Sequence, residues 1–395
     1  MPQVAVMLPT TVNTYRGLLH GILQFVHLHG PWSVHIIEGR EGEQKLLRPD
    51  KWGYTGFIGY LKDRRYAERL LASHIPAIII DPSEESRAPQ DPFSRLSRIE
   101  CDNRMIGQQA ADFFLSKKFR HFVYIGEVNG ATWSEKRQMV FCERLRQAGF
   151  PCEVYPRLTV SARKDFGIEQ SRLCDWLKRL PKPVAILAAN DVRGRQVLDS
   201  CLKTGIDVPQ EVAVLGVDND VTICETTTPQ MSSIQMNTEQ MGAEAARVLD
   251  RMMRDRKGNV HQQTVMHYGF SHLVSRRSTD SVQVSDALIA RAMEFIRINA
   301  GSSMTVDDLV RHLHVSRRSL ETRFKTEMRH TVYAEIMRMR LERVQKLLRE
   351  SPMKIEDISD TCGFASASHL GTVFRTHFGV TLSAFRRQTR KGWPR

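Results

Sequence analysis

The sequence has few cysteines and no long apolar run. Its seven cysteines among 395 residues form no Cys-x-x-Cys pair, and scattered thiols in odd number are typical of a reduced, intracellular protein without a zinc site. No apolar stretch approaches the roughly 20 residues that a membrane-spanning helix needs. The opening residues, MPQVAVMLPT, lack the basic lead and cleavage site of a secretory signal. We therefore expect a cytoplasmic protein with no membrane partner.

Motifs of the common enzyme classes are also missing. The sequence contains no glycine-rich phosphate-binding motif, no nucleophilic serine turn and no cluster of metal-ligating residues. We therefore expect no catalytic residues, no cofactor and no bound metal. A sugar-acting α/β enzyme is the alternative, and detectable turnover of a sugar would support it.

Positive charge is present in excess and is unevenly placed. The chain has 57 Lys+Arg against 44 Asp+Glu, a formal net charge of +13. From Ser281 onward there are 20 basic and 12 acidic residues, a net charge of +8, whereas the first 280 residues hold 37 and 32. Charge density is thus about four times higher in the C-terminal part, as binding to a phosphate backbone requires.

Strand-like apolar runs alternate with helical patterns from Gln3 to about Ser275. Continuous Val/Ile/Leu strands between helices are typical of buried parallel sheets. Because about 275 residues exceed what one such sheet usually needs, we expect two α/β lobes in a domain over residues 1–278. The expected strands are 4–8, 32–38, 55–60, 77–81, 121–126, 184–190, 212–218 and 231–236, and the expected helices are 15–29, 104–118, 135–147, 192–204 and 238–254.

Polar side chains follow several of these strands. In open α/β sheets ligands bind beyond the carboxyl ends of the strands. Asp, Asn and Arg side chains can hydrogen-bond a hydroxyl-rich ligand, and Trp or Tyr can pack on its apolar face, which is the chemistry a sugar needs. Any single Asp or Asn here is more often a helix cap, so the prediction rests on the group. Its members are Asn13, Tyr15, Arg16, Trp133, Arg137, Asn190, Asp191, Arg193, Asp218 and Asn219.

The C-terminal part contains a sequence repeat. LETRFKT at 320–326 recurs as LGTVFRT at 370–376, with Leu, Thr, Phe, a cation and Thr at matching positions. Each copy follows a short helical pattern and a tight turn, and each can begin with a serine cap, Ser316 or Ser366. Two helices joined by a tight turn indicate a helix-turn-helix unit, here present twice.

The outer face of each second helix carries side chains that can donate to base edges and phosphates in a major groove. An amphipathic segment with Tyr333 and Leu348 on its apolar side joins the two copies. Its roughly 19 residues would span nearly 30 Å as a helix, close to the roughly 34 Å between successive major-groove faces. A helical bundle with a solvated basic face is the alternative. The candidate DNA-binding residues are Arg317, Arg318, Glu321, Thr322, Lys325, Ser368, His369, Thr372 and Arg375.

GFASASHLGTVFRTHFGVTLSAFRR at 363–387 resembles the signature of the AraC/XylS family of transcription regulators. The resemblance implies two helix-turn-helix units in adjacent major grooves, in a DNA-binding domain over residues 285–390. It places Arg318, Glu321 and Thr322, then Ser368, His369 and Thr372, at base-reading positions. Arg329 and Val332 stand where that family usually has Gly and Pro, Val344 replaces a frequent Ala and Leu382 a frequent Pro.

The first part resembles LacI/GalR-type sugar sensors and the periplasmic sugar-binding fold. The resemblance rests on ILAANDVRGRQVLDSCLKTGIDVPQEVAVLGVDND at 186–220 and on SSIQMNTEQMGAEAARVL at 232–249, which is similar to a segment that crosses between lobes. It implies sugar contacts by Asn190 or Asp191, Arg137 and Asp218. The combination predicts a sugar-controlled transcription regulator that acts as an activator, with operator DNA and RNA polymerase as partners and a homodimeric state. A sugar-binding transport protein is the alternative, but it leaves the basic domain unexplained.

Overall fold

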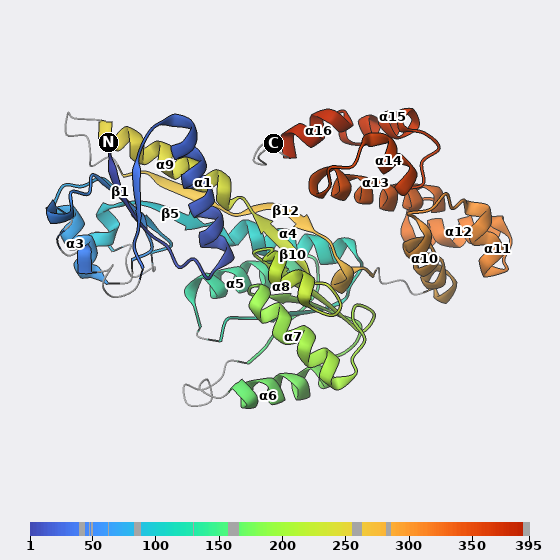
Figure 1. The fold of residues 1–395 in the computed structure, drawn as a ribbon. Coiled ribbons are helices and arrows are strands. Elements are labelled where there is room, and N and C mark those ends of the chain that lie inside the picture. Colours follow the sequence, from blue (N-terminus) through green and yellow to red (C-terminus); the bar gives the residue numbers. More distant parts are fainter. Residues whose placement is uncertain are drawn as a thin grey trace. The chain divides into compact units, whose positions relative to one another are not determined.

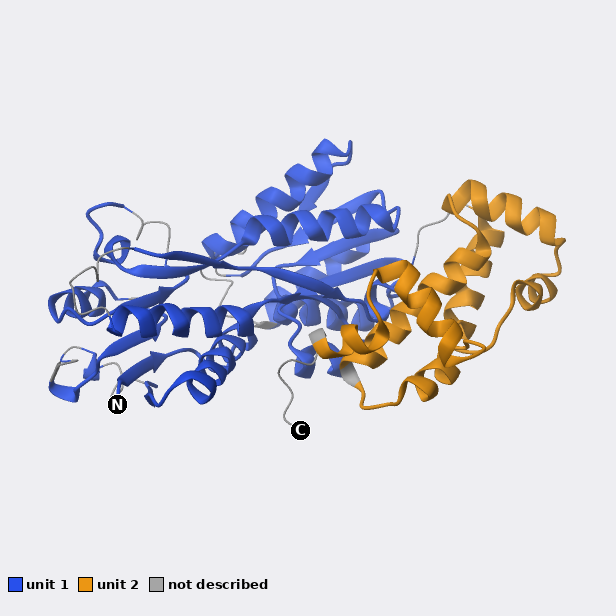
Figure 2. Cartoon of the chain, turned by 90° about the horizontal axis from the view of Figure 1, so that it is seen from above, with its two compact units in different colours: residues 1–281 blue, residues 282–395 orange. Residues whose placement is uncertain are grey.

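The protein is described by a computed structural model that covers residues 1–38, 44–46, 48, 50–61, 63–82, 88–128, 130–156, 166–254, 263–281 and 286–389. Two compact units divide the chain, Met1–Ser281 and Val282–Arg395 (Figure 2). The predicted ends of the second domain, residues 285 and 390, lie outside the described residues. Within the described ranges no helix is long and apolar enough to cross a membrane.

The first unit contains two mainly parallel sheets (Figure 1). Sheet A has the order β11-β5-β4-β3-β1-β2 and sheet B the order β12-β10-β9-β8-β6-β7. The strands of sheet A are β1 (Gln3–Met7), β2 (Ser33–Ile36), β3 (Gly56–Gly59), β4 (Ala77–Ile80), β5 (Ser97–Cys101) and β11 (Val265–Tyr268). Those of sheet B are β6 (His121–Ile125), β7 (Cys152–Val154), β8 (Val184–Ala188), β9 (Val212–Val217), β10 (Ser232–Met236) and β12 (Phe270–Val274).

Helices connect the strands, and the five predicted ones are present with ends shifted by up to three residues. In the described part of the chain, short 3-10 turns occur at Asp50–Trp52, Pro92–Arg95 and Arg277–Thr279. The α-helices of this unit are α1 (Asn13–His29), α3 (Arg64–Ala72), α4 (Asn103–Ser116), α5 (Thr132–Gln147), α6 (Phe166–Arg179), α7 (Asp191–Thr204), α8 (Val221–Thr226) and α9 (Thr238–Arg254).

The central strands explain the parallel arrangement. Every residue of β8 and β9 is buried, and the two strands pair in parallel register from Val184 with Val212 to Leu187 with Leu215. Strands that are covered on both faces need helices on both sides of the sheet, which the intervening helices supply. The predicted two-lobed α/β class is therefore confirmed. Strand β12 is an exception to the parallel arrangement, because it pairs antiparallel with β10 at the edge of sheet B.

The chain crosses between the two lobes three times. After β5 it passes from sheet A to sheet B at Asp102, it returns after β10 at Asn237, and it crosses again between β11 and β12 at Gly269. These crossings are joined to one another: the Asp102 amide donates to the Tyr268 carbonyl, and the Asn237 amide donates to the Gly269 carbonyl at 3.0 Å. Segment 232–249, which resembles a lobe-crossing segment, contains the second crossing. It begins in β10 of sheet B and continues into α9, which packs on α1 in the lobe of sheet A.

The second unit is helical and contains the repeat (Figure 1). The second helix of each copy begins at the predicted serine cap, where Ser316 Oγ accepts from the Ser319 amide and Ser366 Oγ from the His369 amide. Both end in a left-handed residue, Arg329 and Gly379. The helices are α10 (Ala287–Asn299), α11 (Val306–Leu313), α12 (Arg317–Met328), α13 (Val332–Glu350), α14 (Ile355–Thr361), α15 (Ala367–Phe378) and α16 (Leu382–Thr389).

One apolar core holds this unit together. Phe324 of α12 and Phe374 of α15 occupy matching repeat positions and are fully buried in the same cluster. The connector α13 has the predicted 19 residues, and Leu348 lies in the core, but Tyr333 does not. Its side chain is 54% exposed, whereas the adjacent Val332 and the following-turn Ile336 are buried in the core, so Tyr333 lies on the outer face of α13. The predicted pair of helix-turn-helix units is confirmed.

Candidate functional site

Side chains from both lobes gather at the carboxyl ends of the strands. Tyr15, Tyr60 and Asp81 follow β1, β3 and β4 of sheet A, Asp218 follows β9 of sheet B, and Arg137 lies in α5. The rings of Tyr15 and Tyr60 are 5.8 Å apart. Burial, and then the nearby charges of Asp81 and Asp218, raise the pKa of the Tyr15 phenol. We call these five residues the interlobe cluster.

Asp218 is held in an unusual conformation. Its φ is +110° and that of Asn219 is +47°, both in the region that non-glycine residues seldom adopt. Thr14 of the other lobe donates to Oδ1 of Asp218 at 3.1 Å, and Asn13 Nδ2 donates to its carbonyl oxygen at 2.9 Å. Burial raises the pKa of the Asp218 carboxyl to about 6, although Arg137 acts in the opposite direction. The carboxylate is thus a buried acceptor beside a buried cation.

Arg137 is the cation of the interlobe cluster, and its side chain is 3% exposed. It donates from Nη2 to Asn103 Oδ1 at 2.8 Å and from Nη1 to the Ala189 carbonyl. The guanidinium lies 5.2 Å from the centre of the Trp133 ring. Its Nε has no hydrogen-bond partner among the described residues. A buried donor without a partner is uncommon in proteins, so this atom is a strong candidate for a ligand contact.

Asp191 lies beneath the loop that carries Asp218. It is 1% exposed; its Oδ2 accepts from the Asp220 amide at 2.7 Å and its Oδ1 from the Ser233 hydroxyl at 2.6 Å. Ser233 Oγ in turn accepts from the Asn219 amide at 3.0 Å. Burial, and then Asp218, raise the pKa of the Asp191 carboxyl. These bonds show that Asp191 supports the strained loop.

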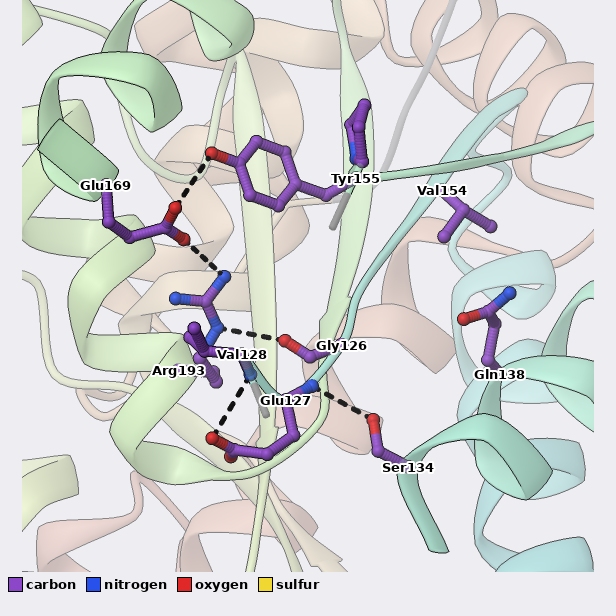
Figure 3. A pocket seen from close by; sticks show the side chains of 10 residues that line it. Gly126, Glu127, Val128, Ser134, Gln138, Val154, Tyr155, Glu169 and Arg193 are labelled. Atoms are coloured by element: carbon purple, nitrogen blue, oxygen red, sulfur yellow. Dashed lines mark hydrogen bonds and ion pairs between the residues drawn. The ribbon is translucent and has the colours of Figure 1, made fainter. Parts of the chain in front are cut away.

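Two other predicted ligand residues make contacts outside the interlobe cluster. Asn190 caps α7 by accepting from the Arg193 amide at 2.9 Å, and it donates to Glu127 at 3.1 Å. Arg193 is 2% exposed and reaches into a different pocket, where it donates to Glu169 at 3.0 Å and to the Gly126 carbonyl at 3.0 Å (Figure 3). An arginine with a buried carboxylate partner mainly maintains local structure.

The remaining predicted residues lie at the rim. Arg16 is exposed and pairs across the lobes with Asp220 at 2.8 Å. The Asn219 amide group donates to Gln235 at 2.8 Å, and its oxygen accepts from Arg276 at 2.9 Å. Trp133 is half-buried under the Arg137 guanidinium. The structure therefore brings Tyr15, Arg137 and Asp218 together, with Asn13 bonded to the Asp218 carbonyl and Asp191 supporting the loop that carries Asp218.

Sequence reasoning missed Asp81, Tyr60 and Tyr268. Asp81 accepts from the Cys101 amide at 2.9 Å and from the Tyr268 hydroxyl, and burial raises its pKa to about 6. Asp81 ends the strand pattern AIIID, so the rule that selected Asp218 would also have found it. Tyr268 carried no such signal, because β11 is short and enters sheet A from a distant part of the sequence.

The predicted DNA-binding side chains of α12 lie mostly in solvent. Arg318, Thr322 and Lys325 are exposed and Glu321 is half-buried. Arg317 is exposed too, but it donates to Asp307 of α11 at 3.0 Å. Three of the five therefore stand free on one helix face for a partner, and Arg317 must leave or share its carboxylate to contact DNA.

The second copy presents a similar face. Ser368, His369, Thr372 and Arg375 of α15 are all exposed. The His369 ring packs edge-on against Phe364 at 5.8 Å between ring centres, which fixes its direction. The same periodicity thus leaves polar donors on the outer face of both second helices, as major-groove recognition requires.

Comparison with known proteins agrees with this architecture. A periplasmic binding protein-like domain matches residues 111–279 and a helix-turn-helix domain matches residues 309–388. The xylose operon regulatory protein of Haemophilus influenzae is 31% identical over 333 residues, 84% of each chain. That of Escherichia coli K12 is 26% identical over 374 residues, 94% of this chain and 93% of that protein.

Solved structures show the same arrangement of elements. The structure of a xylose-binding transcription activator, xylR, covers 98% of both chains with a TM-score of 0.62 and 26% identity. The complex of the regulator CelR with cellobiose covers 70% of this chain and 84% of that chain, with a TM-score of 0.54 and 21% identity. The second similarity shows the fold alone.

Fold, sites and comparisons together define a transcription regulator that joins a periplasmic-binding-protein-like sensor to AraC-type helix-turn-helix units. The chain belongs to the family of the xylose operon regulatory proteins. It is a sugar-sensing, DNA-binding regulator and not an enzyme.

Proposed function

We propose that a pentose, with D-xylose as the best candidate, binds at the interlobe cluster and holds the two lobes closed. The observation that carries this proposal is the convergence of Tyr15, Asp81, Arg137 and Asp218 from the ends of strands in both lobes. The names of the relatives, xylose operon regulatory proteins, support the choice of sugar.

The chemistry of the cluster suits a small polyol. Ionised Asp81 and Asp218 would accept hydrogen bonds from adjacent hydroxyls, and the free Nε of Arg137 would donate one. The ring of Trp133 and that of Tyr15 offer apolar faces to the C–H side of a sugar ring. Because these groups come from two lobes, a ligand that contacts both favours the closed state over an open one.

The DNA partner would be contacted by the outer faces of α12 and α15. Arg318, Thr322, Ser368, His369 and Thr372 would reach base edges. Lys325 and Arg375, further along each helix, would contact phosphates. Glu321 would accept from a cytosine amino group, and Arg317 would exchange Asp307 for a phosphate.

The regulator would act as a homodimeric activator in the cytoplasm, with RNA polymerase as its protein partner. Two copies of a unit that reads two neighbouring grooves give enough contacts for specific binding. In vitro transcription with polymerase, with and without sugar, distinguishes activation from repression. Sedimentation of the full chain at several concentrations measures the oligomeric state.

A ligand screen on the full chain tests the effector. Pentoses and hexoses are added singly during thermal unfolding, and each sugar that stabilises the protein is titrated by calorimetry. A ligand present at 100 times its Kd adds about 2.7 kcal/mol of stability, so a true effector gives a clear shift. We expect D-xylose to give the largest shift. A hexose that stabilises the chain more than every pentose would replace xylose, and no stabilisation by any sugar would contradict the proposed site.

A further inference from the structure

The turn between α10 and α11 contacts both halves of the helical unit. This turn, Ala300–Met304, follows the end of α10 at Asn299 and leads directly to Thr305, the cap of α11. It therefore leads directly into the first helix-turn-helix copy, α11 and α12. Residues from other parts of the unit meet it, among them Arg340 and Arg343 from the connector α13 and Gly363 from the second copy.

Arg340 binds the turn from the connector side. Its side chain is 7% exposed, and it donates from Nε to the Ala300 carbonyl at 3.1 Å. Nη2 donates to the carbonyls of Ser302 at 2.7 Å and Met304 at 2.8 Å. The Ala300 oxygen lies at the end of α10, where helix carbonyls lack intrahelical partners and the helix dipole is negative. A planar cation with several donors thus fixes three carbonyls at once.

Gly363 meets the turn from the side of the second copy. It follows α14 with a φ of +70°, and a Cβ built there would overlap the Ser302 carbonyl oxygen and lie 2.6 Å from its carbon. The same Cβ would be 3.2 Å from Nη2 of Arg340. The two backbones are therefore in direct contact, and Arg340 lies at the point where they meet.

This contact adds a constraint that the connector alone does not supply. A helix fixes the distance between its ends, but the short links 329–331 and 351–354 at the two ends of α13 leave rotations about single bonds. A second contact between the copies removes that freedom, because the turn is fixed to α13 by Arg340 and to the second copy by Gly363. The orientation of α12 relative to α15 is then set.

We propose that Arg340 and Gly363 are positioning residues that set the spacing between the two DNA boxes read by α12 and α15. The proposal rests on the proposed reading of DNA by these two helices. Neither residue needs to touch DNA. Their effect is that only duplexes with one spacing allow both helices to make base contacts at the same time.

The test begins with selection from a randomised duplex library by the full wild-type chain, in parallel without sugar and with D-xylose. We expect two boxes at one spacing. Affinity is then measured for the selected duplex and for duplexes with one base pair inserted or removed between the boxes. For the wild type we expect each change to weaken binding about tenfold or more, the loss of at least one base contact. A wild-type selection without paired boxes would overturn the proposal, and DNA binding with no sequence preference would also overturn the proposed reading of bases.

Variants of the two residues give the decisive comparison. Arg340→Met keeps an unbranched side chain without donors, and we expect the affinities for the three spacings to differ by less than about threefold. Arg340→Lys keeps the charge but cannot span three carbonyls, and we expect an intermediate profile. It carries the comparison if Arg340→Met does not fold. A purely structural role would lower affinity by the same factor at every spacing, and that result would overturn the proposal.

The second copy offers a matched pair of glycines. Gly379 also follows a helix with a positive φ, +72°, but a Cβ there would meet nothing within 4 Å. Gly363→Ala and Gly379→Ala therefore introduce the same backbone strain, and only the first disturbs the turn. We expect Gly363→Ala to flatten the spacing profile and Gly379→Ala to leave it as in the wild type. Equal profiles for the two variants would contradict the positioning role.

Discussion

Asp218 is a residue whose ionisation should affect stability and sugar binding in opposite ways. Its folded-state pKa of about 6 lies above the ordinary 3.8, so the folded chain binds this proton more readily than the unfolded chain. The contribution to the free energy of unfolding therefore rises as pH falls through 6 and levels off near 3.8. Above pH 6 the Asp218 carboxyl is ionised, and its buried charge destabilises the sensor. The ionised form is also the one that would accept hydrogen bonds from sugar hydroxyls.

Asp218→Asn should separate these effects. We expect higher thermal stability than wild type at pH 8, a weaker dependence of stability on pH between 7 and 5, and loss of stabilisation by sugar. Burial still raises the pKa of Asp81 and of Asp191 in this variant, although Asp191 loses the contribution of Asp218, so part of the pH dependence should remain. Thermal unfolding across pH and calorimetry with sugar measure both, with Asp175→Asn on the exposed face of α6 as control. Unchanged sugar affinity would remove Asp218 from the site.

Arg318 and Arg317 are adjacent but should behave differently. Arg318 is exposed at a proposed base-reading position, whereas Arg317 is paired with Asp307. Arg318→Ala should weaken binding to the selected duplex by about 1–3 kcal/mol and relax preference at one base pair. Arg317→Ala should weaken binding less and equally for all sequences. A uniform loss for Arg318→Ala, measured over single-base variants of the duplex, would make that residue a phosphate contact instead.

Arg329 occupies a position that favours glycine. Its φ is +66°, and the matching residue of the second copy, Gly379, has a φ of +72°. A non-glycine residue in this conformation costs roughly 1–2 kcal/mol, and the extra freedom of glycine in the unfolded chain offsets roughly 0.5–1 kcal/mol. Arg329→Gly should therefore stabilise the helical unit by roughly 0.5–1 kcal/mol in denaturant unfolding. Gly379→Ala should do the reverse, and a loss of stability in Arg329→Gly would show that the arginine side chain matters more than its backbone.

At the scale of elements, the start of α1 connects the two lobes of the sensor. Arg16 pairs with Asp220 across the lobes, and Asn13 and Thr14 contact Asp218. Because Arg16 is exposed, its ion pair is worth roughly 0.2–1 kcal/mol. We expect Arg16→Ala to weaken sugar binding by up to about fivefold, since the pair favours the closed state that the sugar needs.

A double-variant cycle distinguishes this role from direct sugar contact. If Arg16 acts through Asp220, then Asp220→Asn should weaken sugar binding by a similar factor. In calorimetry the double variant should then bind sugar about as tightly as the single variant with the lower affinity. Arg65→Ala is the control, because Arg65 pairs with Asp63 within one lobe. Additive losses in the double variant would show that Arg16 contacts the sugar itself.

Elements with strong periodicity could be predicted from sequence, and those with weak patterns could not. Strands such as β8 (VAILA) and β9 (VAVLGV) are continuous runs without a polar residue, because they are buried on both faces. The edge strand β7 has three residues, two half-buried and one exposed, and β11 alternates exposed and buried positions over only four. Such short strands are determined by pairing with distant segments rather than by local sequence.

The sequence could predict that polar residues gather at the carboxyl ends of the strands, but not which of those residues would meet. The rule that polar residues follow strands found Tyr15, Arg137 and Asp218, which the structure brings together. It could not show that Arg193 turns away to Glu169, because the partner lies in a separate helix. The same limit applies to Arg340, whose three carbonyl partners become neighbours only when the helices pack.

At the scale of the whole molecule, control by sugar requires two states of the sensor. Because three crossings near Asp102, Asn237 and Gly269 join the two lobes, we expect any movement of the lobes to occur about those crossings while each sheet stays intact. A ligand that contacts both lobes then shifts the population toward closure, but only by its difference in affinity for the two states. The helical unit has its own core, so we expect it to fold without the sensor.

The isolated fragment 281–395 should therefore bind DNA without regard to sugar. It contains both helix-turn-helix copies, the connector and a net charge of +8, and these supply the contacts to two neighbouring major-groove segments. Footprinting should show the same two segments for the fragment with and without sugar, whereas affinity or footprint of the full chain should change when sugar is added. The Asp218→Asn full chain, which should no longer bind sugar, is the control and should respond as the fragment does. A full-length protein whose footprint, affinity and transcriptional output all ignore every sugar that binds it would contradict the coupling between sensor and DNA-binding unit.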